Sequence, residues 1–597
     1  MKKHIIYFAI AIGGLLTTGC SLDREYLNGP SAGAFPATAD EALSGLMSAY
    51  KNLTLMDSSS TPFPGIQDNV TDIGSTRVTS TANYIDQLRS QFSTENALSE
   101  KLYKQIYKGA GRVHMVLDNM DNLRDKMDEE EFYAVKAELL LVRDYYYELG
   151  CQMFGDMVFV DHVLGLNEVA NQRMPRAQVI DRILNEDLKD ELLDYLPVRY
   201  DKEKWGTGRL GRVGAYGLKA RIALNWGFYE EAAKYADKAL KLADGVYDLE
   251  PFDVTYCGKD HSEGEPSVSN IFGTKGRNCD EMIWALQYDQ TISSNQHNGG
   301  YYAAPRIAGG CSYFGPTQNL IDAFQCTDGK SITESDLYDW ENPWKNRDPR
   351  LDLYCVRPGS RVLGLEFQTA KSKTKIYDYT NKKEVANIEA SGSKSEYGAN
   401  GSKGPAGYLW RKYIDMDEMT YNGGSFSTSS KCVLNYPLMR LAELYLIRAE
   451  ANIEMDGGDL VQAKADIETI RSRAKMPALT VSDQAGLRKA LRYERMVELC
   501  NEGFRWFDIR RWKIAETVVS GTMYAPSDAN DGPMSNAKPS FDANWHPDYS
   551  SGATFDGKKA NLRKFLEMSF NPLKDYLWPI PNAEYIANTG IEQNPYY

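Results

Sequence analysis

Residues 436–512 hold the most regular pattern in the chain, two amphipathic helical segments joined by a glycine-containing turn. In the first segment, apolar residues recur at the spacing of one helical face: Leu438, Leu441, Ala442, Tyr445, Leu446 and Ala449. Pro437 suits the first turn of this helix, and Gly457 and Gly458 suit its end. The second segment repeats the period at Leu460, Ala463, Ile467, Ile470 and Ala474. Because the turn is short, we predict an antiparallel αα-hairpin.

A third segment, ALRYERMVELCNEGFRWFDIRRW, is dense in carboxylates and arginines. Glu494, Glu498 and Glu502 follow one another at i+4 steps, which predicts three carboxylates along one side of a helix. Their Cβ atoms would be about 5 to 6 Å apart, but the groups would point the same way and could not flank a glycosidic bond. We therefore interpret the segment, with its Arg495, Arg505, Arg510 and Arg511, as a partly buried ion-pair network rather than an active site.

The N-terminal segment MKKHIIYFAIAIGGLLTTGC has the pattern of an export signal, with Lys2 and Lys3, an apolar run, and small residues before Cys20. The apolar run is shorter than the about 20 residues that span a bilayer, so cleavage is expected. A cysteine at this position resembles the lipobox of bacterial lipoproteins, although Thr17 stands where that motif usually has leucine. We expect residues 1–19 to be the signal peptide and Cys20 to carry lipid. An ordinary secretory signal is the alternative.

Charge and cysteine usage restrict the ligand classes. The formal net charge is -14 and the pI is about 5.2, so the chain lacks the basic surface that neutralises phosphates. This argues against nucleic acid and against an anionic polymer as the main ligand.

The cysteines after Cys20 form no CxxC pair, which gives no indication of a zinc site and leaves disulfide pairing open: they are Cys151, Cys257, Cys279, Cys311, Cys326, Cys355, Cys432 and Cys500.

Residues 39–246 have a mostly helical pattern, including QVIDRILNEDLKDELLDYL as one expected helix. A later helix pair shares its spacing with the hairpin above, as seen in Tyr229, Ala232, Ala236 and Ala239 against Leu460, Ala463, Ile467 and Ile470. Small residues facing large ones, at about 34 residues per pair, are typical of tetratricopeptide stacking. Residues 247–435 are instead rich in Gly, Ser, Asn and aromatic residues. We expect this insertion to carry function.

Within the insertion, EMIWALQYDQ is expected to form a short strand. Residues 295–324 are expected to form a glycine-punctuated loop that leads into a helix, and residues 336–359 a turn and a strand. Residues 371–407 and 521–558 are polar and are expected to form exposed loops or hairpins.

Several segments in this order resemble the SusD/RagB family of surface nutrient-binding lipoproteins from Bacteroidetes-type bacteria: CSLDREYLNGPS, PTQNLIDAF followed by DGK, NRDPRL, YPLMRLAELYLIRAEA, ERMVELCNEGFRWFDIRRW and LWPIPNAEYIANTGIEQNPYY. The resemblance covers nearly the whole chain. It implies a mostly α fold of four tetratricopeptide-like helix pairs that scaffold a variable, loop-rich ligand region with a few short strands. We expect one domain over 20–597, with a helical scaffold at about 39–246 and 436–515, a variable region at about 247–435, and closing segments at 516–597.

The resemblance also implies a function. Family members are not enzymes; they bind oligosaccharide or polysaccharide and deliver it to a SusC-type TonB-dependent barrel in the outer membrane. Asp23 and Glu25 resemble the family's signal for display on the cell surface, so we expect a lipid-anchored protein that faces the exterior. A peptide-capturing lipoprotein of the same family and a surface glycan hydrolase are the alternatives.

A sugar site needs flat aromatic faces surrounded by amides, carboxylates or arginines. Two loops supply such residues, 65–89 and 294–314, and the family's ligands lie near equivalent loops. We expect ligand contacts from Asp72, Arg77, Asn83, Tyr84, Gln296, Asn298, Tyr301, Tyr302 and Tyr313. His297 lies in the second loop and is interpreted as a ligand contact or a solvated residue rather than a general base.

None of the histidines lies in an HExxH, CxxCH or GxSxG setting, and no Walker loop is present, so the sequence gives no support for a catalytic site. The segment DNVTDIG offers oxygen ligands, but Ile73 replaces the glycine expected at the sixth position of an EF-hand loop. We therefore predict no catalytic residue, no cofactor and no EF-hand, and leave metal binding open.

Overall fold

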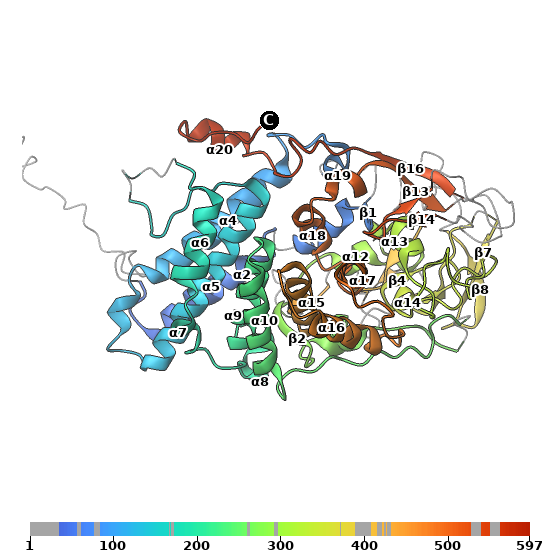
Figure 1. Ribbon diagram of the computed structural model, residues 1–597, viewed down its shortest axis with the longest axis horizontal. Coiled ribbons are helices and arrows are strands. Elements are labelled where there is room, and N and C mark those ends of the chain that lie inside the picture. Colours follow the sequence, from blue (N-terminus) through green and yellow to red (C-terminus); the bar gives the residue numbers. More distant parts are fainter. Residues whose placement is uncertain are drawn as a thin grey trace, which may run out of the picture.

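The computed structural model describes residues 35–597 except for 57–60, 77–83, 166–167, 169–171, 260–262, 290, 292–295, 371, 389–406, 415–420, 423–424, 427–431, 527–538 and 550–561. The long helices lie together on one side of the molecule, and the strands and loops on the other (Figure 1). This confirms the predicted mostly α fold with a loop-rich region and only short strands. Within the described ranges, none of the helices has both the length and the apolar character needed to cross a membrane.

The N-terminal half forms the first layer of helices: α2 (Ala39–Lys51), α4 (Ala97–Leu117), α5 (Glu129–Phe154), α6 (Arg176–Arg182), α7 (Asp190–Leu193), α8 (Lys202–Trp205), α9 (Arg212–Asn225) and α10 (Tyr229–Ala243). Helix α2 begins where the Thr38 hydroxyl accepts a hydrogen bond from the Glu41 N–H. Helices α4 and α5 approach closely because Gly109 has no side chain; a Cβ there would lie 2.3 Å from the Tyr146 ring.

The helix predicted over QVIDRILNEDLKDELLDYL is divided in two. A π-helical turn at Ile183–Asp187 separates α6 from α7. The wider turn changes the phase of the apolar residues, so that Leu188 and Leu193 both become fully buried.

The second layer of helices contains α15 (Leu441–Glu454), α16 (Leu460–Arg473), α17 (Gln484–Glu498), α18 (Arg505–Arg511) and α19 (Ala515–Val518). Helix α15 packs against α16 and α17 and also against α10 of the first layer. Asp459 caps α16 by accepting hydrogen bonds from the N–H groups of Val461 and Gln462. The predicted αα-hairpin is therefore confirmed, and it continues the stack of helix pairs.

The predicted start of this hairpin is wrong, because residues 436–440 form a strand instead of a first helical turn. Strand β12 (Tyr436–Arg440) pairs antiparallel with β2 (Met282–Leu286), which confirms the strand predicted in EMIWALQYDQ. Pro437 lies opposite Ala285, next to a register shift where a missing N–H is tolerated. Pairing with a strand distant in sequence outweighs the local helical period.

The helix predicted to carry three carboxylates is also shorter than expected. Helix α17 ends at Glu498, and Asn501 and Gly503 have positive φ angles of 61° and 90°. A backbone in this left-handed region cannot continue a right-handed helix. Glu502 therefore lies in a turn between α17 and α18.

Buried ion pairs surround this turn and form what we call the central ion network: Arg350, Lys412, Arg440, Arg473, Glu281, Glu494, Glu498 and Glu502. Glu498 accepts from Arg440 Nη2 at 3.2 Å and from Arg350 Nη1 at 3.3 Å. Glu502 accepts from Arg440 at 2.7 Å and from Lys412 Nζ at 2.8 Å. Burial would raise the pKa of Glu498, but the neighbouring guanidinium groups hold it below its usual range. A buried ion-pair network is therefore confirmed, but its cations come from other segments. Arg495 and Arg511 pair with Glu450 and Asp508 instead, and Arg505 pairs with Asp72.

The loop-rich side contains short helices and strands: α3 (Pro64–Gln67), α11 (Ser269–Phe272), α12 (Gly299–Ala303), α13 (Gln318–Ala323), α14 (Arg350–Tyr354), β1 (Gly74–Thr76), β3 (Phe314–Pro316), β4 (Cys355–Val356), β5 (Arg361–Val362), β6 (Leu365–Glu366), β7 (Lys375–Asp378), β8 (Lys383–Ala386), β9 (Leu409–Trp410), β10 (Tyr421–Asn422) and β11 (Ser425–Phe426). Strands β5 to β8 form one sheet and the others pair in twos. The β7–β8 hairpin confirms a hairpin within 371–407. Helix α14, which was not predicted, precedes β4.

Residues 521–558, expected to form an exposed loop or hairpin, contain paired strands. Strand β13 (Gly521–Pro526) pairs antiparallel with β16 (Leu562–Met568), and β14 (Ser540–Phe541) pairs with β15 (Pro547–Asp548). Met523 and Leu566, which lie opposite each other in the first of these ladders, are both buried. Their burial explains why this segment is paired and not an open loop.

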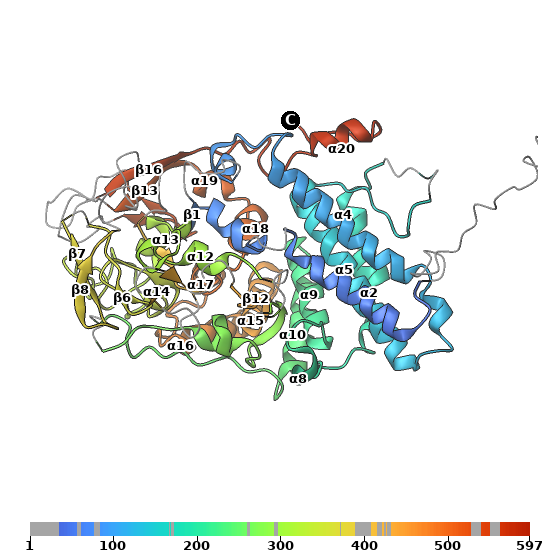
Figure 2. The ribbon, with the colours of Figure 1, turned by 180° about the vertical axis from the view of Figure 1, so that it is seen from behind.

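The last part of the chain returns to the N-terminal helices, and α20 (Asn582–Ala587) lies near the start of α4 (Figures 1 and 2). The Trp578 N–H donates to the Met153 carbonyl at 2.6 Å, and the Asn582 N–H donates to the Thr94 carbonyl at 3.0 Å. The Asn594 amide donates to the Phe154 carbonyl at 2.8 Å. The largest apolar core accordingly draws on side chains from α2 through to this final segment.

All of the cysteines that follow Cys20 in the sequence are free thiols, and all except Cys257 are buried. The pairing that the sequence leaves open is therefore absent among these described residues.

Candidate functional site

The β1–β3 ladder brings the two predicted ligand loops together. Thr76 at the end of β1 lies opposite Phe314 at the start of β3. Tyr84 of the first loop follows β1 in sequence, and α12 of the second loop precedes β3. Two loops more than two hundred positions apart therefore meet at one place.

Five aromatic side chains meet at this junction, and we call them the tyrosine cluster: Tyr84, Tyr301, Tyr302, Tyr313 and Phe314. The ring centroids of Tyr302 and Tyr313 are 5.0 Å apart, and those of Tyr84 and Phe314 are 6.3 Å apart. Tyr313 and Phe314 are only 8% and 5% exposed, whereas Tyr84, Tyr301 and Tyr302 are partly exposed. The cluster thus has a buried base and three rings with accessible surface.

Backbone hydrogen bonds fix the loop that carries Tyr301 and Tyr302. The Tyr313 N–H donates to the Tyr302 carbonyl at 2.7 Å, and the Cys311 N–H donates to the Tyr301 carbonyl at 2.9 Å. The Ser312 N–H donates to the Ala304 carbonyl at 3.1 Å. A loop held in this way loses little conformational entropy when a ligand binds.

Polar groups around the rings are suited to sugar hydroxyls. Asn298 is partly buried, and its amide donates to the Tyr302 hydroxyl at 3.4 Å. Burial raises the pKa of Tyr84 and of Tyr302 further above neutral pH, and both hydroxyls are protonated there and can donate. Gln296 is in the same region but is only 7% exposed.

Asp72 does not lie at the surface of this site. It is 2% exposed, and both carboxylate oxygens accept from Arg505, at 2.9 Å from Nε and 2.7 Å from Nη2. This buried bidentate pair connects the first loop to α18 and leaves the carboxylate unavailable to a ligand. We therefore remove Asp72 from the proposed site. Arg77 and Asn83 lie outside the described residues, as does Cys20.

The oxygen-rich segment that begins at Asp68 also belongs to the interior. The Asp68 carboxylate accepts from the N–H groups of Glu502, Gly503 and Arg505, at 2.9 to 3.1 Å. The Asn69 side chain accepts from the Trp410 indole at 2.8 Å. Within the described part of the chain, no group of three or more His, Cys, Asp or Glu side chains is arranged to hold a metal ion.

His297 is neither a solvated residue nor a ligand contact. It is 1% exposed; its Nε2 lies 2.9 Å from the Leu434 carbonyl, and its Nδ1 accepts from the Gly299 N–H at 3.0 Å. These partners require the neutral ring with a proton on Nε2, because a carbonyl only accepts. His297 therefore fixes the start of α12, the short helix that carries Tyr301.

This position makes the protein sensitive to acid. Burial lowers the pKa of His297 to about 4, so between that value and 6.5 the unfolded chain binds a proton that the folded chain does not. Stability should therefore rise with pH in this window, and His297 should contribute about 2 kcal/mol to the loss between pH 7 and pH 5. Urea unfolding of the native protein and of a His297→Gln variant at both pH values measures this contribution, because other titrating groups are common to both proteins. Equal pH dependence in the two proteins contradicts the assignment.

Phe314 was not predicted, since the sequence criteria considered only tyrosines and hydrogen-bonding side chains. The available signal was its position next to Tyr313, at the end of the predicted loop 294–314. Trp344, by contrast, packs edge-on against Tyr408 at 6.2 Å and under the Arg357 guanidinium at 5.2 Å, which indicates a packing role.

Comparisons with known proteins agree with this architecture. A family model described as "SusD family" matches residues 280–597, and one described as "Starch-binding associating with outer membrane" matches residues 47–224. The chain is 22% identical to SusD-like protein P2 of Formosa agariphila over 100% of this chain and 99% of that one. It is 22% identical to the starch-binding protein SusD of Bacteroides thetaiotaomicron over 65% of this chain and 66% of that one.

Solved structures show the same fold. A SusD-like carbohydrate-binding protein from Bacteroides fragilis superposes with a TM-score of 0.73 at 20% identity, covering 93% of this chain and 99% of that one. A laminarin-binding SusD-like protein superposes with a TM-score of 0.57 at 18% identity, covering 94% of this chain and 100% of that one.

Proposed function

Because the chain belongs to the SusD family, we propose that it is a non-catalytic protein that binds an oligosaccharide and delivers it to a SusC-type TonB-dependent transporter in the outer membrane. The observation that supports glycan binding is the tyrosine cluster. Three partly exposed rings from two loops lie over a buried aromatic base. Aromatic faces of this kind stack on the apolar faces of pyranose rings, and the neighbouring hydroxyls and amide fix orientation.

The names of the relatives support carbohydrate as the ligand class, since they include a starch-binding and a laminarin-binding protein. We further propose that Cys20 anchors the mature chain to the outer membrane through lipid, with the protein facing the cell exterior. The family description "associating with outer membrane" supports this location.

The first test is binding without turnover. A panel of neutral oligosaccharides, including starch-type and laminarin-type fragments, is titrated into the full mature chain by calorimetry. We expect saturable binding of at least one oligosaccharide, with no new reducing ends after overnight incubation compared with a protein-free control. Released reducing ends would establish a hydrolase. Binding of peptides alone would establish the peptide-capturing alternative.

A further inference from the structure

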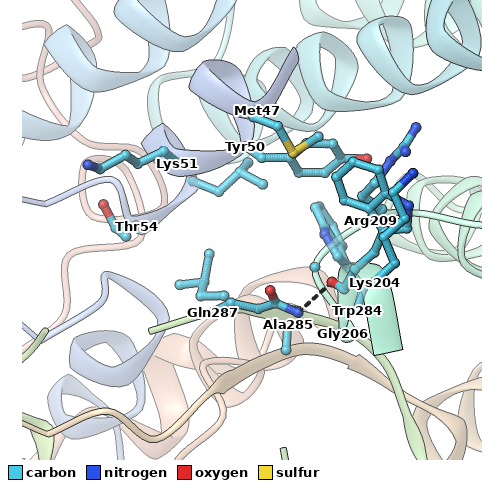
Figure 3. A pocket seen from close by; sticks show the side chains of 14 residues that line it. Met47, Tyr50, Lys51, Thr54, Lys204, Gly206, Arg209, Trp284, Ala285 and Gln287 are labelled. Atoms are coloured by element: carbon cyan, nitrogen blue, oxygen red, sulfur yellow. Dashed lines mark hydrogen bonds between the residues drawn. The ribbon is translucent and has the colours of Figure 1, made fainter. Parts of the chain in front are cut away.

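A second pocket lies on the helical side of the molecule, between α2, β2 and the loop that joins α8 to α9 (Figure 3). Its volume is about 470 Å³, within the range of about 300 to 1,000 Å³ that is typical of small-molecule sites. It shares no lining residue with the tyrosine cluster: the side chains that argue for a ligand are Lys51, Lys204, Trp205, Arg209 and Gln287.

The pocket is positively charged in an acidic protein. Lys51 and Thr54 lie toward one end in Figure 3, and Lys204 and Arg209 toward the other. None of the fourteen lining residues, all of them described, is an aspartate or a glutamate. Arg209 pairs with the buried Glu138 behind it, but neither lysine has a salt bridge within the described part of the chain. The two exposed lysines therefore leave an uncompensated positive charge, although the chain as a whole carries -14.

The loop from Lys204 to Arg209 holds its cations in place. The Arg209 guanidinium lies 4.6 Å from the centroid of the Trp205 ring, and Lys204 Nζ lies 4.9 Å from it. Cation–π contacts of this kind restrict where a flexible side chain can point. Lys204 is thus held at this end of the pocket before any ligand arrives, while Glu138 balances the charge of Arg209.

Two glycines shape the wall next to these cations. A Cβ on Gly206 would lie 2.2 Å from Gln287 Nε2, and a Cβ on Gly208 would lie 2.9 Å from the Gln287 side chain. Their absence lets Gln287 approach the loop, where it donates to the Trp205 carbonyl at 2.9 Å (Figure 3). The amide is therefore fixed between the two charged ends.

We infer that this pocket binds an acidic saccharide unit, one that carries a carboxylate or a sulfate. The anionic group pairs with the lysine at one end of the pocket, Gln287 meets hydroxyls, and the apolar wall that includes Met47 and Leu286 covers the ring. The choice of a saccharide rests on the proposed glycan-binding function. The positive charge of the site is independent of that proposed function.

The test uses the full mature chain and matched variants. Digalacturonate, glucose 6-sulfate and neutral cellobiose are titrated by calorimetry into the native protein, a Lys51→Ala/Lys204→Ala variant and a Lys104→Ala/Lys241→Ala control. The control removes the same charge from two exposed lysines outside the pocket. We expect an acidic probe to bind the native protein and the control, and to bind the pocket variant at least about tenfold more weakly. Raising the salt concentration should weaken the binding of the acidic probe to the native protein, because the charges are near the surface.

Each outcome shows whether the inference about the pocket or the proposed function fails. If the acidic probes bind nowhere, or bind the pocket variant as well as the native protein, the inference is overturned. If they are displaced by a neutral glycan that needs Tyr301 and Tyr302, they occupy the tyrosine cluster and the inference is again overturned. If an acidic probe binds in the pocket while no neutral glycan binds at all, the proposed function fails and the charged pocket stands. The sulfate and carboxylate probes distinguish the two anionic groups.

Discussion

Replacing Glu498 with alanine is expected to lower the free energy of unfolding by about 3 to 5 kcal/mol and to leave glycan affinity unchanged. Glu498 is fully buried and accepts from Arg350, Arg440 and Arg473. Each guanidinium group keeps another carboxylate partner, but the buried network loses one negative charge, and the uncompensated positive charge left in the interior is the source of the loss. No residue of the tyrosine cluster contacts Glu498, so the protein that remains folded should bind as before.

Chemical denaturation followed by circular dichroism measures this change as a shift in midpoint at constant m-value. Arg505→Ala should lose a similar amount, about 3 kcal/mol, because Asp72 is then buried and unpaired. The control is Glu100→Ala, which breaks an exposed pair with Lys104 and should change stability by no more than about 0.5 kcal/mol. A Glu498→Ala protein of native stability that no longer bound glycan would contradict the structural assignment of the central ion network.

The lowered pKa of Glu498 makes the stability that the central ion network provides depend on pH. Because the folded-state pKa is held below the 4.5 of an unperturbed glutamate, the contribution of Glu498 to stability is fully present above that value and is lost as the pH falls below it.

Replacing Tyr301 and Tyr302 together with alanine is expected to weaken glycan binding by about 10- to 100-fold, that is about 1.4 to 2.7 kcal/mol. The rings are partly exposed and supply stacking area, so their loss removes ligand contacts. Stability should change much less than in Glu498→Ala, because the backbone hydrogen bonds of the loop do not depend on these side chains. Calorimetric titration with the best glycan from the panel, together with a denaturation curve, separates the two effects.

Two comparisons sharpen this prediction. Tyr301→Phe/Tyr302→Phe keeps the rings and should retain most of the affinity, which distinguishes stacking from hydroxyl contacts. Tyr377→Ala/Tyr379→Ala removes another pair of tyrosines whose rings are in contact, 5.0 Å apart on the β7 side of the molecule, and should leave affinity unchanged. Unchanged binding in the Tyr301→Ala/Tyr302→Ala protein would exclude the tyrosine cluster from the glycan site.

Local sequence pattern predicted the helices well because their apolar stripes depend only on residues a few positions apart. The same pattern predicted secondary structure less well where contacts with residues distant in sequence determine the conformation. Residues 436–440 follow a helical period but pair with β2, about 150 positions earlier. Glu502 continues an i+4 series, but a turn caused by two positive φ angles takes it out of the helix.

The same limit applies to the site. Tyr84, Tyr301, Tyr302 and Tyr313 were predicted from composition and do come together, because the β1–β3 ladder joins their loops. The local sequence around Asp72 does not distinguish a buried carboxylate from an exposed one that binds ligand. Its partner Arg505 is 433 positions away, and no local pattern reveals that pair. Lys51 and Lys204 are likewise ordinary surface lysines until α2 and the loop after α8 are placed on either side of one pocket.

The return of the C-terminal segment to α4 and α5 has a consequence for the order of folding. Thr94 and Met153 complete their hydrogen bonds only with Asn582 and Trp578, so the earliest helices to be synthesised lack part of their packing until the end of the chain is present. Contacts at such sequence separation close the longest loops, which slows the final step of folding. The N-terminal helices therefore complete their packing only after the whole chain has been made.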